Sequence, residues 1–298
     1  MSVTVVSDAD IRKKLRKKSR TGEIWRRFKK NRTAVAGLVI FILIMSVVIF
    51  ADFIVSYNTA VTQRIASRFT QPGSPGHPFG TDNFGRDIMA RIVHGSRNSL
   101  LVGMGAVACG IVLGGLLGSI AGFYGGAADS VIVRTMDTVM CIPLMLLVLS
   151  IVAALGASLV NVLIAMMIAN VPQYTRIVRA AVLSVVGQDY IEAARSCGTP
   201  SFWIIMIHVI PNAIGPIIVQ ATMAVGTMII NAAGISFLGM GIQPPTPEWG
   251  AMLNEAKNYM ISYPFTVIFP GAAIGLTALS LNLMGDGLRD ALDPKLKD

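Results

Sequence analysis

Long apolar stretches, separated by short polar segments, run through most of this chain. Read at about 20 residues per membrane-spanning helix, the sequence contains six apolar windows, at residues 34–55, 100–123, 138–155, 159–171, 214–240 and 265–284. Pro143 predicts a kink in the third window, and Pro172 bounds the short fourth one. The pattern therefore predicts an all-α integral membrane protein with six transmembrane helices.

The composition supports a membrane protein independently of this pattern. Of the 298 residues, 53% are hydrophobic and 14% are charged, against about 25% charged residues in an average soluble domain, and the mean hydropathy is +0.64. The three cysteines, Cys109, Cys141 and Cys197, are scattered and indicate neither a disulfide framework nor a metal site. We expect no metal and no cofactor bound by this chain.

The distribution of lysine and arginine predicts the orientation. With a cytoplasmic N-terminus, 19 of the 25 Lys and Arg residues fall on cytoplasmic segments and six on outer ones. Both termini are therefore expected in the cytoplasm. The dense positive stretch Arg12–Arg32, with Trp25 and Phe28 interleaved, is typical of contact with anionic lipid, and nucleic-acid binding is a poor interpretation. The apolar run that follows is too long for a cleaved signal peptide, so it should persist as an anchor.

A polar segment between the fourth and fifth windows predicts helix, turn and helix. Residues 189–197 are good helix formers, and Gly198 suits the left-handed conformation that ends a helix. Pro200 suits the first position of a second helix, about 201–209, which Pro211 is expected to stop. From local physics alone, the segment is either a docking site for a partner or an ordinary loop between membrane helices.

Four glycines recur every four residues in the second window and form a smooth ridge on one helical face. They are Gly110, Gly114, Gly118 and Gly122. Another helix can approach such a ridge closely. We favour static packing within one subunit over a seam along which helices move during transport.

The polar residues inside the windows bear on the class of transporter. Asp52 is the only charged residue in the six windows, whereas ion-coupled carriers keep ionisable groups near the membrane centre. A secondary carrier is therefore disfavoured. Four polar residues are candidates to line a water-filled path, although each could equally satisfy an interhelical hydrogen bond. They are Gln220, Asn231, Ser236 and Asn282.

The chain shows no motif for its own energy supply or for catalysis. No lysine directly follows a glycine, so the phosphate-binding loop G-x-x-x-x-G-K-[ST] is absent. The sequence at 234–239 does not match the serine elbow G-x-S-x-G. We expect no catalytic residues here, and the energy for transport must come from another subunit.

The spacing of the polar segment resembles the cytoplasmic coupling loop of ABC importer permeases. The matching residues are Glu192, Ala193, Ala194, Gly198 and Pro211, with His208 where an isoleucine is usual. Three further segments, at 80–87, 243–250 and 282–290, are similar to those of the dipeptide/oligopeptide/nickel permease family, on the DppC/OppC side of the pair. The resemblance covers nearly the whole chain from the first window to Pro294.

The resemblance implies a type I ABC importer permease fold in a bacterial inner membrane. It implies a homologous second permease subunit, two ABC ATPase subunits that bind ATP and Mg²⁺, and an extracytoplasmic solute-binding protein. This chain would form half of the pore for di- or oligopeptides, or for glutathione, nickel or another small solute. The loop at Glu192 would sit in a groove on an ATPase and carry its movement into the fifth span.

The expected organisation follows from the windows and the resemblance together. It comprises a basic cytoplasmic tail at 1–33, an anchor helix at 34–56, an extracytoplasmic loop at 57–96, a permease domain at 97–287 with its coupling loop at 188–211, and a cytoplasmic tail at 288–298. The turn-rich segments at 80–87 and 243–250 would form an outer rim that meets a delivery protein. Equally, they could close helix ends, with Asp82 or Asn83 capping the helix that approaches the second span and Pro244–Pro247 ending the fifth.

Overall fold

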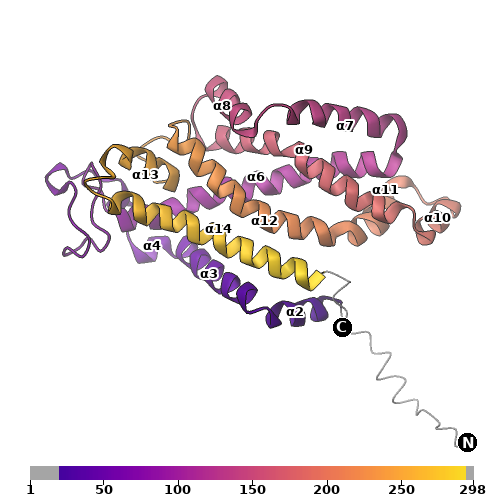
Figure 1. The fold of residues 1–298 in the computed structure, drawn as a ribbon, viewed down its shortest axis with the longest axis horizontal. Helices are drawn as coiled ribbons and strands as arrows, with labels where there is room; N and C mark the ends of the chain where they lie inside the picture. Colours follow the sequence, from indigo (N-terminus) through magenta and orange to yellow (C-terminus); the bar gives the residue numbers. More distant parts are fainter. Residues whose placement is uncertain (1–19, 293–298) are drawn as a thin grey trace, which may run out of the picture.

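The computed structural model describes residues 20–292, which form helices joined by turns, with no β-sheet among them. In chain order the helices are α2 (Arg20–Lys30), α3 (Arg32–Ile49), α4 (Ala51–Ile54), α5 (Tyr57–Val61), η1 (Ile65–Ser67), α6 (Ile88–Tyr124), α7 (Gly126–Met140), α8 (Leu144–Leu155), α9 (Leu159–Val186), α10 (Asp189–Ser196), α11 (Ser201–Trp203), η2 (Ile204–Val209), α12 (Ile210–Phe237), α13 (Trp249–Ala256), η3 (Lys257–Tyr259) and α14 (Phe265–Leu292). The long helices run along one axis, with loop 62–87 at one end and α10 at the other (Figure 1). Parts of the two predicted tails, 1–19 and 293–298, lie outside the described residues.

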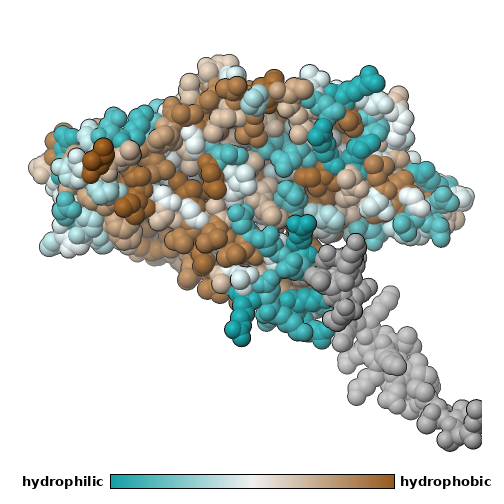
Figure 2. Space-filling view, viewed as in Figure 1, coloured by the Kyte–Doolittle hydropathy of each residue, from teal (hydrophilic) through white to brown (hydrophobic). Residues whose placement is uncertain are grey.

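Each of the six predicted windows overlaps at least one helix. Within residues 20–292, four helices are long and apolar enough to cross a membrane: α3, α6, the continuous helix Ser201–Phe237, and α14. A fifth span is formed if α7 and α8, which meet at 84°, are taken together. The window at 159–171 lies in α9. In Figure 2, brown apolar residues form large areas left of centre and along the upper edge, while teal polar residues gather toward the right-hand end and around α2, with some scattered between them.

Proline had different effects from those predicted at three positions. At Pro143 the third window is broken into two helices rather than kinked, and Pro143 precedes the first residue of α8. Helix α9 continues through Pro172 to Val186, because neighbouring groups in a membrane bundle can compensate for the hydrogen bond that proline removes. Pro211 does not stop a helix: the chain is helical from Ser201 to Phe237, and Pro211 directly follows the π-helical turn at Ile204–Val209 and the first residue of α12.

The glycine ridge of α6 packs against α9, and this is the most extensive helix contact in the described chain. A Cβ atom at Gly114 would lie 2.7 Å from Cβ of Tyr174, and one at Gly118 would lie 2.5 Å from the carbonyl oxygen of Thr175. Gly110 faces the same tyrosine, and Gly122 faces α9 one turn further on. The ridge therefore brings two helices of one subunit together, and movement along it stays a hypothesis.

The anchor helix α3 lies against α14, which separates it from α12. Its first turn is capped by Asn31, whose Oδ1 accepts hydrogen bonds from the backbone N–H of Thr33 at 3.1 Å and of Ala34 at 3.2 Å. The Asn31 Nδ2 also donates to Asp290 at 3.2 Å, and Phe28 of α2 is buried beside Ala34 and α14. The N-terminal helices are thus attached to the last helix of the bundle.

Candidate functional site

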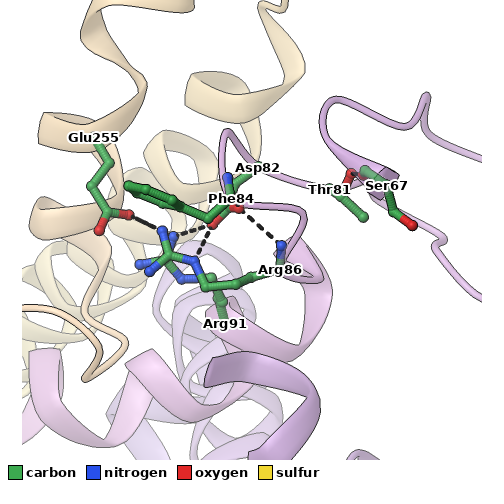
Figure 3. A network of polar contacts seen from close by, with 7 residues as sticks. All are labelled: Ser67, Thr81, Asp82, Phe84, Arg86, Arg91 and Glu255. Carbon is green, nitrogen blue, oxygen red and sulfur yellow. Dashed lines mark hydrogen bonds and ion pairs between the residues drawn. The ribbon is translucent and has the colours of Figure 1, made fainter. Parts of the chain in front are cut away.

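A buried charge cluster joins three separate segments at one end of the bundle (Figure 3). We call its four residues, Asp82, Arg86, Arg91 and Glu255, the charge cluster. Oδ2 of Asp82 lies 2.7 Å from Arg86 Nε and 2.5 Å from Arg91 Nη1, while Oε2 of Glu255 lies 2.6 Å from a guanidinium nitrogen of each arginine. Both arginine side chains are at most 1% exposed. The cluster therefore ties loop 80–87 to α6 and α13 at a place where an unpaired charge would be very costly.

Asp87, rather than Asp82 or Asn83, caps the helix that approaches the second span. Its Oδ1 accepts a hydrogen bond from Ala90 N at 2.7 Å, and its Oδ2 lies 2.7 Å from Nδ1 of His77. The predicted cap at 82 or 83 is wrong, because the helix begins at Ile88 and the Asp82 carboxyl group is occupied by two arginines.

The segment 243–250 docks on α6. The carboxyl group of Glu248 is buried and caps α13 by accepting hydrogen bonds from Gly250 N and Ala251 N, both at 2.8 Å, and it also accepts one from Ser99 Oγ at 3.0 Å. Trp249 Nε1 donates to the Ile92 carbonyl oxygen at 3.0 Å. Pro244–Pro247, which were expected to end the fifth span, do not do so, since α12 already ends at Phe237. Together with the charge cluster, these bonds make one continuous rim.

The segment of residues 188–211 folds as helix, turn and helix, as predicted, and we call it the helix-turn-helix segment. After α10, Gly198 has φ of +74° and donates from its N–H to the Arg195 carbonyl oxygen at 2.9 Å, while Thr199 N donates to that of Ala194 at 3.2 Å. These two bonds make the glycine-dependent motif that commonly ends helices. The second helix passes through a π-helical turn at Ile204–Val209 directly into α12.

The helix-turn-helix segment has a buried side and an exposed side. On the buried side, Ile191, Ile204 and Val209 pack in a cluster with residues of α6 and α9, and the Arg195 guanidinium lies 4.7 Å from the ring centre of Phe123. The exposed side includes Glu192, Ala193 and the large apolar residues Tyr190, Phe202, Trp203, Met206 and Ile207. The sequence had pointed to Glu192 and Ala193 but not to the support from Phe123, which lies far away in the chain.

Two of the four predicted path residues meet in one place. Gln220 of α12 and Asn282 of α14 line a pocket of 380 Å³ together with Gln173 of α9 and Asp286 of α14. We call it the amide pocket. The other two candidates are elsewhere: Asn231 is half-buried, and Ser236 is buried beside Gly241 and Gly250. The sequence did not point to Gln173 and Asp286 as path residues, because both lie just outside the apolar windows at 159–171 and 265–284.

Two ion pairs connect α7 with the second half of α9. Nε and Nη2 of Arg179 donate to the two carboxylate oxygens of Asp129, at 2.5 and 2.6 Å, and Arg176 Nη2 lies 2.5 Å from Asp137. No group of three His, Cys, Asp or Glu side chains arranged for a metal ion exists within residues 20–292.

Comparison with known proteins gives the fold and the family. The structure is similar to an inward-facing conformation of the MetNI methionine ABC transporter, with a TM-score of 0.57 and 18% identity over 69% of this chain and 98% of that chain. This likeness shows a type I ABC importer permease fold. The model of the N-terminal TM domain of oligopeptide transport permease C matches residues 19–72, and that of the binding-protein-dependent transport system inner membrane component matches residues 114–298.

Curated relatives cover almost the whole chain. The dipeptide transport system permease protein DppC of Alkalihalophilus pseudofirmus is 47% identical over 92% of this chain and 90% of the relative. The di/tripeptide transport system permease protein DppC of Pseudomonas aeruginosa is 41% identical over 93% and 92%. The glutathione transport system permease protein GsiD of Escherichia coli O6:K15:H31 is 45% identical over 92% and 90%. With these identities and a family model that matches more than half of its length, this multi-pass membrane chain belongs to the family of binding-protein-dependent transport system inner membrane components.

Proposed function

We propose that this chain is a permease subunit of an ABC importer and forms half of its pore for di- or oligopeptides. The relatives named as dipeptide and di/tripeptide permeases support this cargo. The second half of the pore would come from a homologous permease, and a solute-binding protein would deliver the cargo to the rim. The lysine and arginine distribution favours an orientation with both termini in the cytoplasm. The family of inner membrane components supports a location in a bacterial inner membrane.

The proposal for energy coupling rests on one observation: the helix-turn-helix segment has one buried side and one exposed side. Its exposed side, with Glu192 and Ala193, would sit on one of two ATPase subunits, which hydrolyse ATP with Mg²⁺, while Ala194 packs partly against the buried side. Its buried side would pass the movement on, because the chain is helical without a break from Ser201 through Pro211 to Phe237. The permease would thus switch between inward- and outward-facing states by conformational coupling.

Cys197 allows a direct test of this contact, since it is exposed next to the turn at Gly198. In a chain with Cys109 and Cys141 replaced by serine, a short bifunctional thiol reagent should join Cys197 to a cysteine introduced in the groove of the ATPase. The control keeps Cys109 as the only cysteine of this chain and should give no cross-link. An assembled transporter without a cross-link at Cys197 would overturn the docking assignment.

Glutathione is the second candidate cargo, because glutathione permeases are as similar to this chain as peptide permeases are. Ligand binding by the cognate solute-binding protein, measured by calorimetry with dipeptides and with glutathione, distinguishes the two. An ion-coupled carrier is disfavoured. It would require the chain to transport after reconstitution alone, driven by an ion gradient and without ATPase subunits.

A further inference from the structure

The amide pocket brings together polar side chains from three helices. Gln173 comes from α9, Gln220 from α12, and Asn282 and Asp286 from successive turns of α14. The carboxyl group of Asp286 is the only charged group among the eight described residues that line the pocket. The remaining lining residues are Met223, Ala224, Thr227 and Met228. The pocket thus combines three amides and one acidic group on an otherwise largely apolar wall.

Small residues make this convergence possible. A Cβ atom at Gly226 would lie 3.1 Å from both the Ala278 carbonyl oxygen and Oδ1 of Asn282. A Cβ atom at Gly285 would overlap the side chain of Met223. The two glycines therefore let α12 and α14 approach each other where the pocket opens. This close approach holds the polar groups of two helices within reach of a single small ligand.

The polar groups of the amide pocket have no partners within the described chain. No hydrogen bond or ion pair joins the side chain of Gln173, Gln220, Asn282 or Asp286 to another residue of 20–292. In a membrane bundle, such groups face a water-filled cavity or a protein neighbour. The side chains of Gln173, Asn282 and Asp286 are exposed, so their polar groups are open to a ligand that enters the pocket.

We propose that the amide pocket binds the N-terminal part of a peptide in transit, with Asp286 receiving the α-ammonium group. An extended peptide offers N–H donors and carbonyl acceptors, and a side-chain amide can both donate and accept. An ammonium group forms a charge-assisted hydrogen bond with a carboxylate, which is stronger than a neutral one. The pocket accordingly selects peptides with a free amino end. This inference rests on the proposed peptide import.

Thiol labelling tests the pocket in the assembled transporter. The chain carries Asn282→Cys, with Cys109, Cys141 and Cys197 replaced by serine. The probes are aminoethyl methanethiosulfonate, which is positive, and sulfonatoethyl methanethiosulfonate, which is negative. Relative to a reference chain that keeps only Cys197, we expect about a tenfold stronger preference for the positive reagent at position 282. Asp286→Asn should abolish the excess, whereas Asp290→Asn, one turn further along α14, should preserve it.

Protection by peptide identifies the ligand. Alanyl-alanine should slow labelling at position 282 several-fold, and N-acetyl-alanyl-alanine should slow it less, with the difference lost in Asp286→Asn. No labelling, no charge preference, or equal protection by the two peptides would overturn the proposal. The readout is on this chain and needs no uptake, so its failure is separate from a failure of the proposed function, which would show as absent ATP-dependent uptake with the binding protein present.

Discussion

At one end of the molecule, four charged side chains that are at most 11% exposed tie loop 80–87 to α6 and α13. At the other end, the helix-turn-helix segment rests on α6 and α9 through aliphatic side chains and through Arg195 on the ring of Phe123. In the first arrangement, a displacement of any one segment would separate a buried charge from its partner on another segment, which is costly. The second is apolar and adaptable, and it leaves a broad exposed side. The chain thus combines a fixed rim with a segment built to receive a partner.

Breaking the charge cluster should have the largest effect on stability. Glu255→Ala leaves Arg86 and Arg91 with a single carboxyl partner, and removing one partner of a buried ion pair costs about 3–5 kcal/mol. We expect a clearly lower thermal unfolding midpoint of the purified complex in detergent. Glu192→Ala, at an exposed carboxyl group of the helix-turn-helix segment, is the control and should change stability by about 0.5 kcal/mol or less. Similar shifts for both variants would refute the contrast between the two ends.

The glycine ridge connects these two ends, and filling it should have the next largest effect. Gly114→Leu would force a side chain into Tyr174 and Thr175 of α9, and overpacking of this kind costs about 1–3 kcal/mol. The amount of assembled transporter in the membrane should fall, as measured by quantitative blotting after purification. Gly115→Leu is the matched control, since a Cβ atom there meets nothing within 4 Å. Equal assembly of both variants would argue against a packing role for the ridge.

A change at the turn should separate function from stability. Gly198→Val places a branched residue at a positive φ, which costs about 1–2 kcal/mol locally. Membrane insertion should stay intact, while ATP hydrolysis by the complex should no longer be matched by uptake in proteoliposomes. The control is Gly187→Val, at a glycine with φ of −85° and open space around it. Normal coupling in Gly198→Val would mean that the turn geometry does not matter for transmission.

The smallest effect is expected at an exposed ion pair. Arg176 and Asp137 lie 2.5 Å apart, but their side chains are 52% and 46% exposed. Exposed pairs contribute about 0–1 kcal/mol and are screened by salt. Asp137→Asn should therefore lower the unfolding midpoint far less than Glu255→Ala, and the difference from wild type should vanish at high salt. A large, salt-independent loss would show that this pair is as important as the charge cluster.

Local physics predicted the parts of this protein that depend on local sequence. Apolar length located the long helices, and Gly198 indicated its own turn, because both signals are contained in neighbouring residues. Pro172 was misinterpreted because packing of α9 in the bundle outweighs the local preference of proline. The charge cluster could not be predicted from local sequence, because Glu255 and Arg86, which bind each other, are 169 positions apart in the chain. Only the folding of α13 back onto α6 brings them together.

The unbroken helix from Ser201 to Phe237 has a mechanical consequence. At 1.5 Å per residue, Trp203 lies about 35 Å from Gly226, and Gly226 lies about 17 Å from Phe237. If the helix pivots at its tight contact at Gly226, its two ends move in opposite directions. Phe237 should then move about half as far as Trp203, because it lies about half as far from the pivot. Spin labels at Met206 and Leu238 should move in opposite directions when ATP binds, whereas parallel movement would mean that the helix slides.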